Sequence, residues 1–356
     1  MAKFSDVFSD ETKRGHKIQT SDYLHSGNHP IIDQGQSQIA GYTNLEDGIF
    51  TDVPAIIFGD HTRVIKYIDT PFFLGADGVK VLKSKLRDVD YKYLFYCLQN
   101  AKIPNTGYNR HFKWLKEIEV PLPLIDEQHR IAAVLDKVSD LIAKRREQLD
   151  KLDELVKARF VEMFGDEQKR MLISGVCKII TDGTHQPPPF VSEGIPFLFV
   201  SNIVTNTITY NTEKYITQDT YDELIKRTPI EIGDILLSTV GSYGHPAIVK
   251  DNRQFLFQRH IAYLKPKTEV VYSEYLYSAL LSDDVQRQIE EKVKGVAQKT
   301  LNLSEIRTII IPTPSRDKQK TFCHILDRIG ESKLTIQQSL DKLEVLKKTL
   351  MQQYFG

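Results

Sequence analysis

The sequence predicts an α+β fold in which two similar mixed α/β domains alternate with two long helices that form an antiparallel coiled coil. Three observations lead to this prediction. Residues 121–165 return as residues 312–356 with no gap in the alignment. Both copies space their apolar residues by four and three in alternation, the heptad pattern of helices that pair with each other. The longer segments outside the copies carry β-type runs and a short helix in the same order.

The first predicted domain covers residues 1–114. Apolar or alternating runs at 55–58 and 64–68 favour strands, and glycine-aspartate turns interrupt such runs. A short helix is expected near residues 91–99, and a glycine-led loop follows at 107–111.

The first helical repeat covers residues 115–165. Pro121 and Pro123 exclude a helix just upstream, and Asp126 adds the negative charge that a helix start favours. Gly165 offers a left-handed C-terminal cap. The predicted helix has about 35 to 40 residues and is near 55 Å long. Its apolar stripe consists of Ile131, Leu135, Val138, Ile142, Leu149, Leu152, Val156 and Met163.

The second half repeats this order. Residues 166–302 form the second predicted domain, with strands at 235–237, 247–249 and 261–264 and a helix at 274–281. Its glycine-led loop at 295–299 aligns with the first loop, which pairs Ile118 with Ile306 and places Lys299 where the first loop has His111. Residues 303–356 form the second helical repeat. Its stripe consists of Phe322, Leu326, Ile329, Ile336, Leu340, Leu343, Leu350 and Tyr354.

Composition narrows the class of protein. The formal net charge is +0, so no global field attracts the chain to a polyanion, and any such surface must be a local patch. The three cysteines are widely spaced, which supports neither a disulfide framework nor a zinc site and fits a reducing cytoplasm. We see no signal-peptide core and no apolar run near the ~20 residues of a membrane helix, and we expect a cytoplasmic protein.

Motifs for catalysis are missing from the sequence. There is no phosphate-binding G-x-x-x-x-G-K-[ST] loop and no GxGxxG turn after a strand. Residues 186–190 read QPPPF, but an adenine methyltransferase needs Asn or Asp before the Pro-Pro-aromatic turn, and Pro187 stands there. We therefore expect no catalytic, cofactor-binding or metal-binding residues in this chain.

At this level of detail the chain resembles the specificity (S) subunit of type I restriction-modification systems. The resemblance rests on the ordered, duplicated set of strings PLPLIDEQHRIAAVLDKV, LDKLDELVKARFVEMFG, IDQGQSQIAGYT, GYNRHFK and GDILLSTVGSYG. It implies two target-recognition domains, each reading one half of a split, asymmetric site in double-stranded DNA. It also implies a coiled coil that sets the half-site distance and docks two DNA adenine methyltransferase subunits. Those subunits would bind S-adenosylmethionine, and a motor-nuclease restriction subunit would use ATP.

Candidate DNA contacts follow from the chemistry of base edges. Arg and Lys pair with guanine, Asn and Gln pair with adenine, and hydroxyl, aromatic and histidine groups supplement them. Loops rich in such groups, together with basic residues for phosphate, give the candidates His61, Arg63, Lys80, Lys83, Tyr108, Asn109, Arg110, His111, Thr184, His185, Ser238, Thr239, Ser242, Tyr243, Arg259, Gln298 and Lys299.

Two alternatives stay open at this point. The duplicated domains could belong to a protein-interaction scaffold, or one domain could be a self-contained methyltransferase with unrecognised chemistry.

Overall fold

The computed structural model describes residues 1–107, 109–295 and 299–356. The chain divides into two compact units, Met1–Arg146 with Gln338–Gly356, and Glu147–Gln337. Each unit combines one globular domain with half of each long helix. The domain boundaries predicted at residues 114, 165 and 302 remain predictions, because the units divide the chain within the helices instead.

The domain of the first unit contains one main antiparallel sheet, in which the strand order is β2-β8-β5-β6. A smaller sheet has the order β4-β3-β7, and β1 pairs with β9. The elements are β1 (Ala2–Lys3), α1 (Phe4–Val7), β2 (Phe8–Asp10), β3 (His29–Ile32), β4 (Gly41–Thr43), β5 (Ala55–Gly59), β6 (Ile65–Ile68), β7 (Phe73–Leu74), β8 (Val79–Ser84), α2 (Tyr91–Gln99), α3 (Phe112–Leu115) and β9 (Glu119–Val120).

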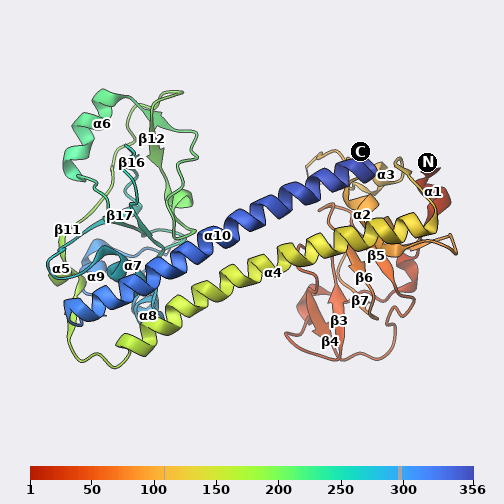
Figure 1. The fold of residues 1–356 in the computed structure, drawn as a ribbon, viewed down its shortest axis with the longest axis horizontal. Coiled ribbons are helices and arrows are strands. Elements are labelled where there is room, and N and C mark those ends of the chain that lie inside the picture. Colours follow the sequence, from red (N-terminus) through yellow and green to blue (C-terminus); the bar gives the residue numbers. More distant parts are fainter. Residues whose placement is uncertain (108, 296–298) are drawn as a thin grey trace. The chain divides into compact units, whose positions relative to one another are not determined.

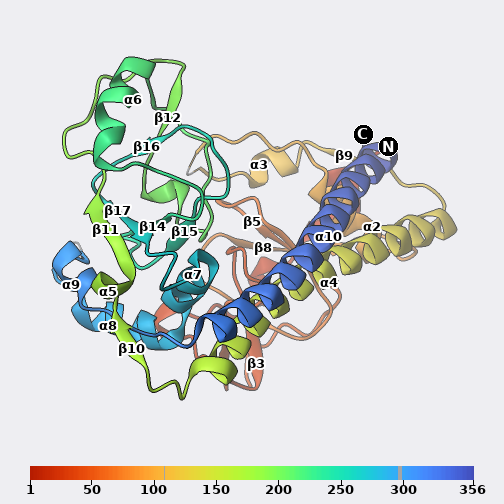
Figure 2. The same ribbon diagram turned by 60° about the vertical axis from the view of Figure 1, so that its left-hand side comes forward.

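The second unit has the same plan, with the main sheet β11-β17-β14-β15, the smaller sheet β13-β12-β16 and the pair β10-β18. Figure 2 shows α7 beside this domain's main sheet, where it contacts β15. The elements are β10 (Arg170–Leu172), α5 (Ile173–Val176), β11 (Cys177–Asp182), β12 (Ile195–Leu198), β13 (Tyr215–Ile216), α6 (Gln218–Leu224), the short 3-10 helix η4 (Ile225–Arg227), β14 (Ile235–Ser238), β15 (Pro246–Ile248), β16 (Leu256–Phe257), β17 (Ile261–Pro266), α7 (Ser273–Leu281), α8 (Asp283–Lys292), α9 (Leu303–Arg307) and β18 (Ile310–Pro312).

The two domains therefore share one topology, which confirms the predicted fold class. In both smaller sheets the last pairing is parallel, β3 with β7 and β12 with β16. The strands and the α2 and α7 helices lie where the sequence predicted them. Helices α6 and α8 belong to the second domain and had no sequence prediction; the burial of Val285 and Ile289 on α8 shows that this helix completes the core.

The long helices α4 (Ile125–Phe164) and α10 (Arg316–Phe355) each have 40 residues, and they lie side by side within each unit (Figure 1). In the first unit, Leu135 of α4 and Met351 of α10 belong to one core, and in the second unit Phe160 packs on Phe322. The start of one helix thus pairs with the end of the other, as expected for an antiparallel pair. The predicted apolar stripe is the less exposed face of both helices.

Two local predictions were wrong. Gly165 does not take the left-handed conformation; its N–H donates to the carbonyl of Val161 at 2.7 Å and continues the helical pattern. The alignment of the two glycine-led loops was also shifted. The N–H of Phe4 donates to Ile118, and the N–H of Ile173 donates to Ile309, so Ile118 corresponds to Ile309 and not to Ile306.

Candidate nucleic-acid interface

Gln34 joins the loops of the first domain at one end of its sheets. Its side-chain Oε1 accepts from the N–H of His61 at 3.1 Å, and its Nε2 donates to the carbonyl of Asp77 at 3.0 Å. The hydroxyl of Thr62 donates to the Gln34 carbonyl at 2.6 Å. One glutamine therefore fixes the β3–β4, β5–β6 and β7–β8 connections against one another, a contact that the sequence did not reveal.

The loop that follows residue 107 joins this group through His111. The His111 N–H donates to the backbone carbonyl of Asp60 at 2.8 Å, and the His111 ring Nδ1 lies 3.0 Å from the same oxygen. The side-chain carboxylate of Asp60 accepts from the N–H of Phe112 at 2.7 Å. His111 is completely buried. The structure gives its side chain a supporting role, because no part of it reaches the surface as a DNA contact would require.

Several predicted contact residues gather around this support. Arg63 donates to the carbonyl of Ile103 at 3.4 Å, which brings the turn after β5 close to the segment that leads into the loop. Asn109 and Arg110 are exposed in that loop. The ammonium group of Lys17, and next Arg110, lower the pKa of Asp77, so Arg110 lies near the β7–β8 turn. His61, Arg63, Asn109 and Arg110 thus share one end of the domain.

The predicted lysine cluster is less suited to phosphate. Lys80 lies 3.1 Å from the Asp10 carboxylate and over the Phe112 ring. The side chain of Lys83 is only 13% exposed. Its Nζ lies 2.8 Å from the Asp52 carboxylate and 2.8 Å from the carbonyl of Pro54. Its ammonium group is the main cause that lowers the pKa of Asp52. An ammonium group with these partners ties strand to loop, and the phosphate contact of Lys83 stays a prediction.

In the second domain, the end of β14 and the turn after it contain both buried and exposed candidates. Ser238 is fully buried, and its hydroxyl accepts from the N–H of His245 at 2.9 Å, so the predicted DNA contact of this side chain is also corrected. Thr239 is 5% exposed. Its N–H donates to the carbonyl of His260, and its carbonyl accepts from the N–H of Leu301. Ser242 is exposed at the tip of the turn.

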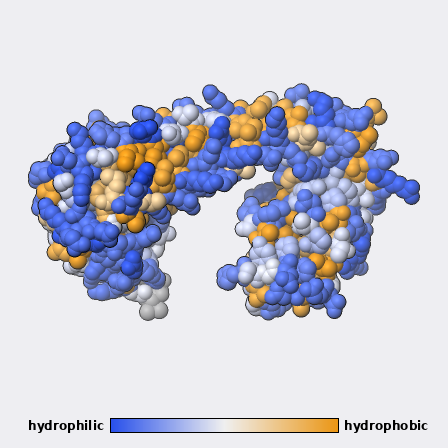
Figure 3. Space-filling view, turned by 60° about the horizontal axis from the view of Figure 1, so that its bottom comes forward, coloured by the Kyte–Doolittle hydropathy of each residue, from blue (hydrophilic) through white to orange (hydrophobic). Residues whose placement is uncertain are grey.

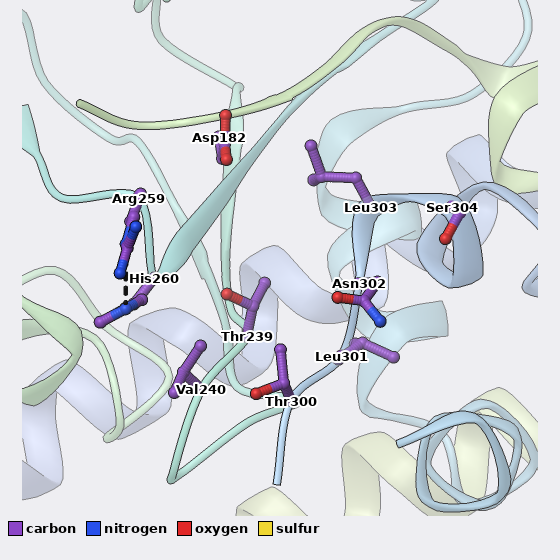
Figure 4. Close-up of a pocket in the computed structure, with 10 residues that line it drawn as sticks. All are labelled: Asp182, Thr239, Val240, Arg259, His260, Thr300, Leu301, Asn302, Leu303 and Ser304. Carbon is purple, nitrogen blue, oxygen red and sulfur yellow. Dashed lines mark hydrogen bonds between the residues drawn. The ribbon is translucent and has the colours of Figure 1, made fainter. Parts of the chain in front are cut away.

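Thr239 lies in the lining of an open cavity of about 590 Å³. Figure 4 shows Arg259 and His260 on one side of this cavity and Asn302, Leu303 and Ser304 on the other. Burial, and next the charge of Arg259, lowers the pKa of His260. The imidazole is therefore neutral at pH 7, and its Nε2 can accept from the Arg259 Nε at 3.4 Å. The wall offers donors and acceptors, among them the Asp182 carboxylate and the Arg259 guanidinium.

A second cavity of about 620 Å³ lies on the other side of the end of β11. Thr184, His185 and the proline run 187–189 line it together with Arg227. Asp182 lines the first cavity and forms an ion pair with Arg227, so this pair stands between the two cavities. The proline run is part of the wall of this cavity.

Tyr243 and Lys299 meet on helix α8. The Tyr243 hydroxyl donates to the carboxylate of Glu290, and the Lys299 Nζ lies 2.7 Å from the same group. Lys299 and Tyr243 together lower the pKa of Glu290. The exposed Lys299 and the half-buried Tyr243 therefore form one cluster around Glu290. Tyr108 and Gln298 lie outside the described residues.

The corrected alignment changes which residues are equivalent at these sites. His111 directly precedes α3 and Asn302 directly precedes α9, so both occupy the N-cap position of a short helix. The counterpart of the buried His111 is thus Asn302, which lines the first cavity, and not Lys299. The sequence also missed Asp182 and Arg227, because the two residues are far apart in the chain and neither belongs to a recognisable motif.

The long helices present a separate surface. Figure 3 shows apolar side chains gathered at the surface over these helices. The exposed apolar residues are Leu141, Leu155 and Val161 on α4 and Leu334, Val345 and Leu346 on α10. These side chains lie outside the paired stripe and leave apolar area on the surface of both helices.

Within residues 1–107, 109–295 and 299–356, no group of three or more His, Cys, Asp or Glu side chains is placed to hold a metal ion. In the same part of the chain, no helix is both long and apolar enough to cross a membrane.

Comparisons with known proteins agree with the duplicated architecture. The family model described as type I restriction modification DNA specificity domain matches residues 1–153 and 173–347. The specificity subunit of the type I restriction enzyme MjaVIII from Methanocaldococcus jannaschii is 24% identical over 315 residues, which are 78% of this chain and 74% of that protein. The EcoR124I/EcoR124II specificity subunit from Escherichia coli is 23% identical over 350 residues, 91% of this chain and 85% of that protein.

Solved structures share the fold. A type I restriction-modification S subunit from M. genitalium matches with a TM-score of 0.55 and 18% identity, over 99% of this chain and 95% of that chain. A chain from a structure of complex assembly and conformational transition of the type I R-M system has a TM-score of 0.54 and 16% identity, over 99% and 95% of the two chains. Because the family model matches both repeats of domain and helix, this chain belongs to the type I restriction-modification DNA specificity family.

Proposed function

We propose that this chain is the DNA sequence-specificity subunit of a type I restriction-modification complex and reads a bipartite, asymmetric site in double-stranded DNA. One observation carries the proposal: the two domains have the same sheet order but different side chains on their loops. With a shared frame, each domain would attach in the same way to the part of the helix pair in its own unit. Different loops then read different half-sites, and the base pairs between them stay unread.

The long helices would bind the other subunits of the complex. Their exposed apolar residues suit the docking of two DNA adenine methyltransferase subunits, one for each repeat. Those subunits would bind S-adenosylmethionine and methylate adenine, and motor-nuclease restriction subunits would add ATP-driven cleavage. This chain would contribute no catalytic residue and hold no cofactor or metal. Since its substrate is chromosomal and invading DNA, the complex would work in the cytoplasm.

A methylation map tests the proposal. N6-methyladenine is mapped genome-wide in cells that carry this chain with its methyltransferase and in cells that lack only this chain. The expected result is a split motif with a fixed gap that disappears without the chain. Exchange of residues 1–114 for those of a relative should then change one half of the motif only. Identical maps with and without the chain would refute the proposal and turn attention to a scaffold role.

The alternative of a self-contained methyltransferase has its own test. The purified chain should not bind S-adenosylmethionine in calorimetry, whereas the assembled complex should. Tight binding by the chain alone would contradict the assignment of methylation to the partner subunits.

A further inference from the structure

Asp182 holds the guanidinium of Arg227 at the surface of the second domain. Arg227 ends the short helix η4, and its Nη2 donates to Oδ1 of Asp182, the last residue of β11. The other oxygen, Oδ2, lies 2.9 Å from Nε2 of His185. The Asp182 side chain is 16% exposed and that of Arg227 is 52% exposed. A largely buried carboxylate on a strand end thus fixes an arginine that faces solvent.

The surroundings of the pair suit contact with a base. Asp182 borders the cavity that contains Arg259 and Thr239, and Arg227 borders the cavity that contains His185. The ion pair therefore joins the linings of two cavities whose walls carry hydrogen-bonding side chains. An arginine side chain fixed in this way loses less conformational entropy on binding than a mobile one.

The hydrogen-bond donors that remain on Arg227 limit which kind of ligand it can bind. Among the described residues, its Nε and Nη1 have no hydrogen-bond acceptor. Nη2 also lies 3.3 Å from His185 Nε2. When that nitrogen carries the proton and donates to Oδ2 of Asp182, Nη2 keeps its second hydrogen for a ligand. A guanidinium presents donors alone, in pairs, and guanine is the base whose major-groove edge has two neighbouring acceptors, N7 and O6. Because Asp182 offsets the positive charge, attraction to phosphate is weakened, and a base contact is favoured over a backbone contact.

We propose that Arg227, positioned by Asp182, reads a guanine in the half-site of the second domain. The inference rests on the proposed function and deepens it. Asp182 acts through the orientation of Arg227, so it is a positioning residue.

The test uses the complete complex in cells, with Arg227→Ala, Arg227→Lys and Asp182→Asn in this chain. Methylated adenines are mapped for each variant, after domain exchange has assigned the half-sites. Arg227→Ala should remove the preference for one G·C pair in the second half-site by about 5- to 150-fold, the loss of one bidentate contact. Arg227→Lys should relax the same base pair, since lysine lacks the paired donors. Asp182→Asn should relax it to a smaller extent.

A matched control is Arg170→Ala. Arg170 is also an arginine in an exposed ion pair of the second unit, 3.0 Å from Asp284, but neither cavity contains it. This variant should leave the motif unchanged. If Arg227→Ala yields too little complex to map, the charge-preserving Arg227→Lys decides the question.

Several results would overturn the inference. They are a second half-site without a G·C pair, an unchanged base preference in the Arg227 variants, or a uniform fall in methylation at all sites, which would indicate a phosphate or structural role. These failures differ from failure of the proposed function. In that case the methylation map would not depend on this chain at all, whatever stands at position 227.

Discussion

Gln128 and Gln319 make the same contacts at the starts of the two long helices. The Gln128 Nε2 donates to the carbonyl of Pro123 at 2.9 Å, and its Oε1 accepts from the N–H of Asp90 at 3.1 Å. The Gln319 Nε2 donates to Pro314 at 3.0 Å, and its Oε1 accepts from Tyr272 at 3.1 Å. Both side chains are buried. The residues that repeat in the sequence therefore include those that fasten each helix to its domain.

Replacement of either glutamine should destabilise the protein. Gln319→Leu would leave the half-buried N–H of Tyr272 and the buried carbonyl of Pro314 without this partner. We expect a loss of about 1–3 kcal/mol per unsatisfied group. Chemical unfolding of the chain would measure this loss, and Gln128→Leu should have an effect of similar size.

The control for the glutamine variants is Gln353→Leu, at an exposed position of α10. It should change the free energy of unfolding by less than about 0.5 kcal/mol, as surface substitutions usually do. Equal losses for Gln319 and Gln353 would show that the buried contacts contribute nothing specific.

The helix pair should depend on its apolar stripe rather than on its ion pairs. Leu340 is 6% exposed, whereas Arg146 and Glu344 form a 2.7 Å ion pair between side chains that are 63% and 45% exposed. Leu340→Ala should cost about 2–5 kcal/mol. Glu344→Ala should cost less than about 1 kcal/mol, and its effect should fade in high salt. Urea unfolding at low and high salt compares the two, and a larger loss for Glu344→Ala would refute the expectation.

The thiols should be unreactive in the folded protein. The ordinary pKa of a cysteine thiol here is 9.0, and burial is the main cause that raises the pKa of Cys97 and Cys177 to about 12. Burial is also the main cause that raises the pKa of Cys323, to about 11. At pH 8 iodoacetamide should therefore label the native chain slowly, Cys323 first because it is the least buried. Mass spectrometry of the alkylated peptides measures the order.

The same pKa shifts predict a pH dependence of stability. Since the folded-state pKa values lie above the unfolded value, the thiols should favour the folded state fully below pH 9. This contribution should be lost as the pH rises from 9 toward 12. A Cys97→Ser, Cys177→Ser variant should lose less stability over that range than the parent. Labelling of Cys97 at the same rate in the native and the unfolded chain would contradict both expectations.

The long helices could be predicted because the heptad pattern persists over 40 residues and appears twice. The loops could not be interpreted as well. His111 and Arg110 are neighbouring polar residues in one loop, yet His111 is buried against the carbonyl of Asp60 and Arg110 is exposed. Arg227 was not predicted, because its role depends on Asp182, a partner that only the folded chain brings near. Composition tells which side chains could bind DNA, whereas tertiary contacts decide which of them support the loops.

Both chain ends belong to the first unit, and the second unit shows how they could be joined. Phe355 packs on Tyr93, with ring centroids 5.3 Å apart, in a core that also contains Phe4. In the second unit the equivalent Phe164 packs on Tyr275 at 5.0 Å, and the chain continues through residues 165–169 into β10. Strand β10 pairs with β18 as β1 pairs with β9. A segment like 165–169 is therefore long enough to connect the end of such a helix to the strand that follows.

A circular permutant should fold and keep its specificity. We expect that a linker of roughly five residues after Phe355, with new ends opened within 166–169, preserves every sheet pairing, because exposed connections tolerate new chain ends. The methylation motif should be identical to that of the parent chain. A permutant opened within β5, whose residues are all buried, serves as the control and should fail to fold. Loss of the motif in the first permutant, with the complex still assembled, would mean that residues 165–169 do more than connect α4 to β10.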